Sequence, residues 1–167
     1  FKVYENRVGV MTNAPSFDWH ITNLRQYMNA TPVQPTSANW SDLELTPLGS
    51  ATGGIGLPGD FSSPSRFVRV AFLRAQILME DIENDGIIEF FHILNNVAMV
   101  KGSVITKDGK DEITQYSSCM NLEKGLYYYK SYNNNQINML DMHKEDLDGS
   151  EMKIFPYNDV QVVNLLN

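Results

Sequence analysis

Arg66 and Asn13 are the two residues whose type and position suggest chemistry beyond local structure. Arg66 falls in the first turn of a predicted helix, just after the glycine-rich stretch 53–60. The positive end of a helix dipole disfavours a cation there, so local stability does not explain the residue. Either Arg66 forms an ion pair with Asp60 or another carboxylate, or its charge serves something outside this segment. Asn13 ends an apolar run before a turn, where its amide either caps the turn or points into a cleft.

The other reactive residue types form weaker patterns. His20, His92 and His143 share no metal-ligand spacing with one another or with Cys and Glu, so we expect no metal site. Cys119 is the only cysteine, which excludes an internal disulfide. No basic residue or helix N-terminus lies near Cys119 in the sequence to lower its pKa, so we expect a structural cysteine and not a nucleophile.

A glycine motif at residues 54–59 matches the dinucleotide-binding pattern G-x-G-x-x-G in its letters alone. That pattern needs a strand immediately before it and a helix immediately after it. Here a proline-rich polar loop precedes the glycines, and Asp60 would repel a phosphate. We therefore expect a tight turn at backbone angles that glycine tolerates, and no nucleotide or other cofactor.

The elements that must position these residues are helices followed by a run of strands. Hydrophobic periodicity and turn residues predict both kinds of element. Helices before an antiparallel meander indicate an α+β fold. A polar connection over residues 30–53 is longer than usual loops, and such loops tend to be functional or interfacial. The predicted helices are 17–29, 64–77 and 86–100, with a break at 81–86; the predicted strands are 7–12, 113–121, 125–132 and 136–143, with weaker ones at 152–155 and 160–166.

Length and composition bound the class of protein. The 167 residues suit one domain or part of a larger one, and 43% hydrophobic with 20% charged residues is normal for a globular chain. A net charge of −7 without a basic block disfavours nucleic-acid binding. No apolar run is long enough for a membrane-spanning helix. The chain begins at Phe1 without an initiator Met or a signal peptide, so we expect that it is cut from a longer protein.

Three sequence blocks, in this order, resemble one known family. The first is MTNAPSFDWH at residues 11–20, followed by NLR at 23–25. The second is GLPGDFSSPSRFVR at residues 56–69, and the third is ITQYSSCMN at 113–121 with KGLYYY at 124–129. Together they resemble the choloylglycine hydrolase family, which contains bile salt hydrolases and penicillin V acylases.

This resemblance implies an N-terminal-nucleophile hydrolase with a four-layer αββα fold that cleaves a linear amide bond. In such enzymes a cysteine at the chain start attacks the amide, and its own α-amino group serves as the base. Asn13 matches the family residue that donates to the oxyanion, and Arg66 matches the catalytic arginine, whose charge can hold the cysteine as thiolate. Arg69 is expected to be structural.

The resemblance also implies that the nucleophile is missing. Phe1 is not a cysteine, and Cys119 lies in the third block. The matching blocks belong to the C-terminal part of the family's chain. We therefore expect residues 1–167 to be the C-terminal portion of a single domain, inactive without its N-terminal part.

Substrate and partners follow from the same resemblance. We expect a small-molecule amide as substrate, namely a conjugated bile salt, with penicillin V as the alternative. The family tends to form homotetramers partly through the connection at residues 30–52. Residues 39–45 look more like Gram-negative members, which favours a periplasmic or exported protein over a cytoplasmic one. Two readings of another kind stay open: a non-catalytic binding or structural module, and an independent thiol enzyme that uses Cys119.

Overall fold

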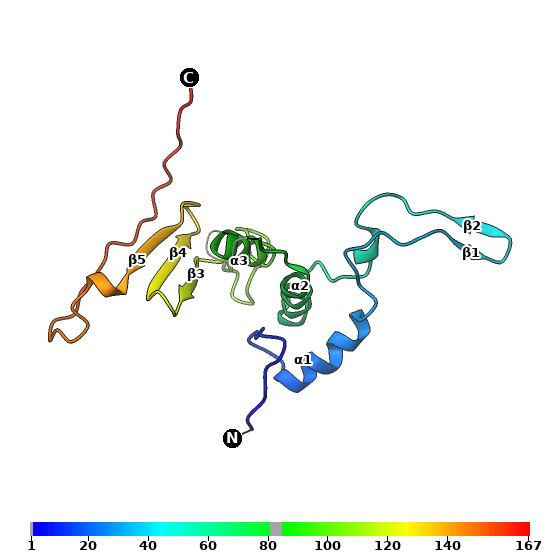
Figure 1. Cartoon of the computed structure of the whole chain (residues 1–167), viewed down its shortest axis with the longest axis horizontal. Helices are drawn as coiled ribbons and strands as arrows, with labels where there is room; N and C mark the ends of the chain where they lie inside the picture. The colour runs from blue at the N-terminus through cyan, green and yellow to red at the C-terminus, as the bar shows by residue number, and fades with distance from the viewer. Residues whose placement is uncertain (1, 81–84) are drawn as a thin grey trace. The chain divides into compact units, whose positions relative to one another are not determined.

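The computed structural model describes residues 2–80 and 85–167, which form two compact units (Figure 1). Of the described residues, the first unit holds 2–80 and 95–97, and the second holds 85–94 and 98–167. Within the described residues, no helix has the length and apolar character needed to cross a membrane. The first unit contains α1 (Phe17–Leu24), β1 (Ala38–Trp40), β2 (Leu43–Leu45) and α2 (Ser63–Gln76); the second contains α3 (Asp85–Asn95), β3 (Tyr116–Asn121), β4 (Leu126–Ser131) and β5 (Asn138–Asp141).

Helix α1 forms where apolar residues recur at helical spacing, but it is shorter than predicted. Its buried face presents Phe17 and His20 one turn apart. After Leu24 the chain tightens into a single 3₁₀ turn, Arg25–Tyr27, so the regular helix does not reach residue 29. A 3₁₀ turn at a helix end is the common way to satisfy the last free carbonyl groups.

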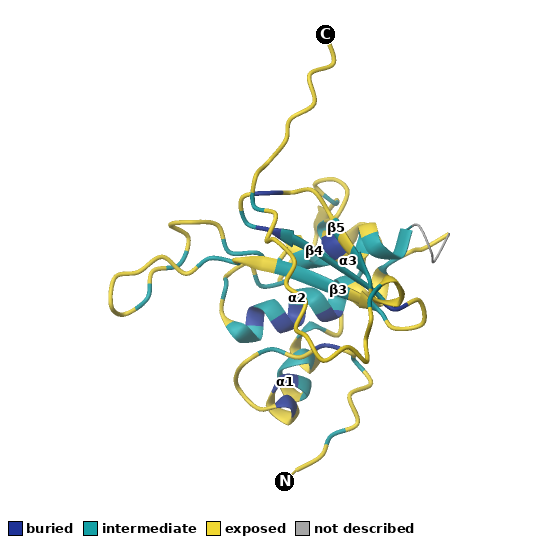
Figure 2. Cartoon of the chain, turned by 90° about the vertical axis from the view of Figure 1, so that its left-hand side faces the viewer, coloured by how far each residue is buried: buried dark blue, intermediate teal, exposed yellow. Residues whose placement is uncertain are grey.

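Helix α2 begins one residue before the predicted start and carries the largest buried face. Pro64 lies in its first turn, where a missing backbone N–H costs nothing. Phe67, Val68 and Ala71 follow at helical spacing and are buried. The buried parts of α2 are dark blue in Figure 2. This face therefore supplies the core of the first unit.

The core of the first unit is a small cluster between α1, α2 and the N-terminal segment. Val10, Phe17, Phe67 and Ala71 are buried in it. The Phe17 and Phe67 rings meet edge to face with 6.3 Å between their centroids. Because the cluster is small, each of its rings contributes a large share of the packing.

The segment 7–12 packs into this core without forming the predicted strand. Gly9 adopts a φ of +66°, which interrupts an extended conformation. The Arg74 guanidinium lies against Gly9 and donates from Nη1 to the Val8 carbonyl at 2.8 Å. The prediction of a strand at 7–12 is wrong because an apolar run becomes a strand only with a neighbouring strand to pair with, and the described residues provide none here.

The long connection contains a hairpin that the sequence did not predict. β1 and β2 pair antiparallel, with Trp40 opposite Leu43. The turn places Ser41 at a φ of +54°. All six strand residues are exposed, and the hairpin extends away from α1 and α2 in Figure 1.

The second unit contains the predicted antiparallel meander. Its strands lie in the order β3–β4–β5, with Cys119 opposite Tyr128 and Tyr128 opposite Met139. β3 starts at Tyr116 instead of residue 113, because Thr114 donates from its backbone N–H to the Met99 carbonyl and not to the ladder. α3 ends at Asn95, five residues before its predicted end. Its predicted break at 81–86 lies mostly outside the described residues.

The predicted strands at 152–155 and 160–166 are wrong, because the C-terminal segment joins no ladder (Figure 2). It is fixed instead by side chains of the meander. The Tyr157 ring stacks on Tyr129 at 6.0 Å, and the Asn158 backbone N–H donates to the Tyr129 hydroxyl. Apolar alternation in a tail therefore did not suffice to build a strand.

Asp60 stabilises the start of α2. Its carboxylate accepts hydrogen bonds from the Ser62 backbone N–H at 2.8 Å and from the Ser65 hydroxyl at 2.6 Å. The hydrogen bonds from Ser62 and Ser65 lower the pKa of Asp60 to about 2. A negative charge at this end also suits the helix dipole.

The Phe67→Ala substitution tests the core of the first unit. Phe67 is fully buried, so removing its ring should leave a cavity and lower the free energy of unfolding by about 3 kcal/mol. Urea unfolding followed by circular dichroism measures this loss. Phe67→Leu, which keeps apolar bulk, is the matched control and should lose less. A loss below about 1 kcal/mol in Phe67→Ala would contradict the assigned core.

The Asp60→Asn substitution tests the cap of α2. The folded-state pKa lies below the unfolded value of about 3.9, so the charged carboxylate stabilises the fold above pH 4. This contribution is lost as the pH falls from about 4 through about 2. We expect Asp60→Asn to unfold at lower urea than the parent at pH 6, with the difference shrinking toward pH 2.5. Asp148→Asn, at an exposed position of the second unit, is the control. A difference that is constant with pH would contradict the role of the carboxylate.

Candidate active site

Arg66 and Asn13 meet in the structure although 53 residues separate them. Arg66 donates from Nη2 to Asn13 Oδ1 at 2.7 Å. Its Nε donates to the Phe61 carbonyl at 3.1 Å. Among residues 2–80 and 85–167, no carboxylate forms an ion pair with Arg66, and Asp60 is engaged by Ser62 and Ser65. The ion-pair interpretation of Arg66 is therefore wrong for this part of the chain.

The bond from Arg66 fixes the orientation of the Asn13 amide. Because the guanidinium only donates, the atom that faces it must be the amide oxygen. The Asn13 NH₂ group then points elsewhere, and it has no partner among the described residues. Asn13 is exposed, so two N–H donors are available to an incoming oxygen. Arg66 also retains three N–H donors that the two bonds do not use.

Three successive residues of the loop before α1 are each held by a different side chain. Thr12 Oγ1 shares a hydrogen bond of 3.1 Å with His20 Nε2 of α1. Asn13 accepts from Arg66, and the Ala14 backbone N–H donates to Ser63 Oγ at 3.0 Å. Both of the latter partners lie in the first turn of α2. Side chains of the two helices thus position this loop, which has no strand to support it.

Arg69, one turn after Arg66, holds the glycine-rich turn in place. Its Nη1 donates to the carbonyls of Pro58 at 2.9 Å and Asp60 at 2.7 Å, and its Nε donates to the Asn96 carbonyl. All three contacts are with backbone, which agrees with the structural role expected for Arg69. The turn itself contains Gly56 at a φ of +96°. It lies after a 3₁₀ turn and not after a strand, so it lacks the context of a dinucleotide site.

His20 is a site neighbour whose contacts the sequence did not reveal. Its ring is 0% exposed and stacks on Phe67 with 4.4 Å between centroids. Burial lowers the pKa of His20, and the nearby Ala14 backbone offsets this only in part, so the ring is neutral at pH 7. The sequence signal that could have found it is the helical spacing from Phe17 to His20, which indicates the buried face of α1 but no partner.

Cys119 belongs to the second unit and has the surroundings of a structural thiol. It lies within β3 and is half-buried. Burial raises the pKa of Cys119, which is opposite to the shift that a nucleophilic cysteine needs. In the described part of the chain, no group of three His, Cys, Asp or Glu side chains could hold a metal ion.

Comparison with known proteins identifies relatives of this chain. The bile salt hydrolase/transferase of Clostridium perfringens (strain 13 / Type A) is 53% identical over 165 residues, covering 99% of this chain and 50% of the relative. The crystal structure of a mutant conjugated bile acid hydrolase from Clostridium perfringens matches with a TM-score of 0.89 and 53% identity, over 99% of this chain and 50% of that one. The chain spans about half the length of the curated relatives it matches.

A more distant structure shares the fold. Penicillin V acylase from Agrobacterium tumefaciens matches with a TM-score of 0.56 at 24% identity, over 80% of this chain and 36% of that one. At this identity the match concerns the fold alone. The α+β class and the N-terminal-nucleophile hydrolase fold expected from the sequence are confirmed by these structures.

The expectation of a periplasmic or exported protein is wrong. It rested on the likeness of residues 39–45 to Gram-negative members. The bile salt hydrolase relatives of the whole chain come instead from Gram-positive bacteria. A likeness over seven residues is too short to outweigh a match along nearly the full chain.

The family assignment rests on the length of the match as well as on these relatives. The family model for linear amide C–N hydrolases, choloylglycine hydrolase family, matches residues 1–155. The match includes α1, α2 and the whole meander, and therefore both units. The chain accordingly belongs to the choloylglycine hydrolase family of linear amide C–N hydrolases.

Proposed function

We propose that these residues are the C-terminal portion of a cysteine N-terminal-nucleophile amidohydrolase that cleaves conjugated bile salts. The observation that carries the proposal is the Arg66–Asn13 hydrogen bond, which leaves the Asn13 NH₂ group free to donate. The bile salt hydrolase relatives, at up to 53% identity, support the substrate class. Residues 1–167 would then be one portion of a single domain.

Asn13 and Arg66 have separate roles in this proposal. An N-terminal cysteine thiolate, supplied by the other portion, attacks the amide carbon, and the carbonyl oxygen becomes an oxyanion. The Asn13 NH₂ group donates to that oxygen. The positive charge of Arg66 keeps the cysteine ionised, and its bond to Asn13 keeps the amide turned so that it donates. The amine then leaves with a proton from the cysteine's α-amino group, and water hydrolyses the thioester.

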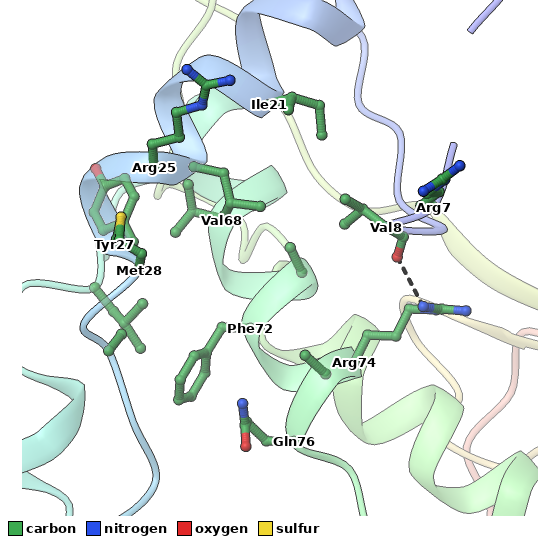
Figure 3. A pocket seen from close by; sticks show the side chains of 15 residues that line it. Arg7, Val8, Ile21, Arg25, Tyr27, Met28, Val68, Phe72, Arg74 and Gln76 are labelled. Atoms are coloured by element: carbon green, nitrogen blue, oxygen red, sulfur yellow. Dashed lines mark hydrogen bonds between the residues drawn. The ribbon is translucent and has the colours of Figure 1, made fainter. Parts of the chain in front are cut away.

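Exposed apolar surface supports the idea that a second portion covers this one. A pocket of about 550 Å³ opens between α1 and α2 and is lined mainly by apolar side chains, among them Met28, Val68 and Phe72 (Figure 3). Asn13 and Arg66 do not line it. Large residues elsewhere are also exposed, such as Leu78 and Met120. A folded domain rarely leaves so much apolar surface in water, so we expect it to be buried in the complete enzyme.

Exposed apolar side chains in the connection at residues 30–52 support the proposal of a homotetramer. The exposed β1–β2 hairpin carries Trp40 at 75% exposure and Leu43 at 62%. An isolated two-stranded hairpin is marginally stable, and exposed aromatic residues are typical anchors of interfaces. We propose that the hairpin packs on another copy of the same protein.

Substitutions at Asn13 and Arg66 test the proposed site in the protein translated from the complete reading frame that encodes this chain. Asn13→Asp keeps the oxygen that accepts from Arg66 but removes the NH₂ donors, so kcat for taurocholate hydrolysis should fall by about 100-fold or more. Arg66→Ala should abolish activity. Lys107→Ala, at an exposed cation of the second unit, is the control and should keep activity. Release of taurine measures each rate.

The outcomes separate the candidate functions. Full activity in Arg66→Ala would refute its role. Faster hydrolysis of penicillin V than of taurocholate and glycocholate would favour the penicillin V acylase alternative. If the complete protein cleaves neither substrate, the non-catalytic module is the better reading. Loss of turnover in Cys119→Ser alone would point to an independent thiol enzyme.

Trp40→Ala tests the proposed tetramer. Removal of a central aromatic anchor should weaken association of the complete protein by about tenfold or more, because such residues carry much of the binding energy. Size-exclusion chromatography with light scattering at several concentrations measures the mass. Leu48→Ala is the matched control, since Leu48 is 98% exposed in the same connection but outside the hairpin. An unchanged mass in Trp40→Ala would refute the hairpin interface.

A further inference from the structure

His20 touches the neighbour of each proposed site residue. Its Nε2 shares a hydrogen bond with Oγ1 of Thr12, the residue before Asn13. The face of its ring lies parallel to the ring of Phe67, the residue after Arg66, at an interplanar angle of 8°. One rigid side chain from α1 thus contacts both segments that must meet for the Arg66–Asn13 bond to form.

Packing alone does not account for a histidine at this position. The ring is fully buried, and its Nδ1 has no hydrogen-bond partner of ordinary geometry among the described residues, although the Ala14 backbone lies near the ring. A phenylalanine would fill a similar flat space and stack on Phe67 without burying an unpartnered nitrogen. What phenylalanine could not supply is the bond to Thr12. The polar edge of His20 is therefore the feature that distinguishes it from an ordinary core residue.

The bond to Thr12 matters because the loop around Asn13 has little other support. Residues 12–14 belong to no helix or strand, and within the described chain their hydrogen bonds all involve side chains of the two helices. Of the three bonds, only the one from His20 comes from the buried side. The bonds of Asn13 and Ala14 come from α2.

We propose that His20 is a positioning residue for the oxyanion donor, holding Thr12 with its Nε2 and Phe67 with its ring face so that Asn13 stays aligned with Arg66. This rests on the proposed function of Asn13 and Arg66. His20 itself touches neither of them through a hydrogen bond and has no part in the reacting atoms. Its effect is on the geometry of the donor, which acts mainly in the transition state.

A double-mutant cycle in the complete protein tests this role. Thr12→Val keeps the shape of the side chain and removes the hydroxyl, and Thr12→Ser is the matched control that keeps it. His20→Phe keeps the flat ring and removes the nitrogen. We expect Thr12→Val and His20→Phe each to lower kcat for taurocholate by about tenfold, with KM changed by less than about twofold. Thr12→Ser should behave as the parent.

The combined variant distinguishes positioning from general destabilisation. If both residues act through one bond, the His20→Phe/Thr12→Val protein should be no slower than the slower single variant. Effects that multiply would overturn the proposal. So would an unchanged kcat in Thr12→Val, or a loss of kcat that simply follows a lower unfolding temperature. If His20→Phe does not fold, the kcat of Thr12→Val alone tests whether the bond between His20 and Thr12 positions Asn13.

A structural readout separates this proposal from the proposed function. If the complete protein hydrolyses no amide, the proposed function fails, and crystal structures of the parent and of Thr12→Val then decide on His20. Separation of Arg66 Nη2 from Asn13 Oδ1 beyond 3.5 Å in Thr12→Val, from 2.7 Å in the parent, supports the positioning role. An unchanged distance overturns it.

Discussion

The hydrogen bond from Arg66 to Asn13 is the contact on which the proposed site depends. A guanidinium in the first turn of α2 is opposed by the helix dipole, and no carboxylate of the described residues compensates it. The bond to a neutral amide oxygen stabilises the charge without neutralising it. The cation therefore remains available to an anion, and the amide is left with its donors outward. One contact thus fixes both a charge and an orientation.

Two charged residues at the start of α2, Asp60 and Arg66, interact with different parts of the structure. Asp60 accepts from Ser62 and Ser65, so its negative charge supports the helix end. Arg66 is therefore free to donate a hydrogen bond to Asn13 in the loop before α1. Arg69 uses three backbone carbonyls to hold the turn that carries Asp60. If Asp60 were paired with Arg66, as the sequence allowed, the helix would gain an ordinary ion pair and the loop would lose its partner.

The sequence predicted α1, α2 and the meander because their signals are local. Apolar spacing acts within a few residues, as do Pro64 in the first turn of α2 and Gly125, which has a φ of +59° in the turn between β3 and β4. The segment 7–12 and the C-terminal tail carry equally apolar runs, yet a strand also needs a partner, which local pattern does not reveal. Arg66 stood out because a helix dipole makes its position unfavourable. Its pairing with Asn13, 53 residues away, depends on tertiary structure, as does the contact of His20 with Thr12.

The loop at residues 12–14 illustrates how narrowly such a site is stabilised. Ordering three residues of irregular backbone costs about 1–2 kcal/mol each. Each of the three side-chain bonds returns about 1 kcal/mol, somewhat more where Arg66 supplies charge. The two sums nearly cancel, so the loop stays in place only while all three bonds act together with the packing of Val10, two residues before it, in the core. The alignment of a donor on such a loop is sensitive to side chains that never contact the substrate. Each of these side chains contributes a substantial fraction of the free energy that stabilises the loop.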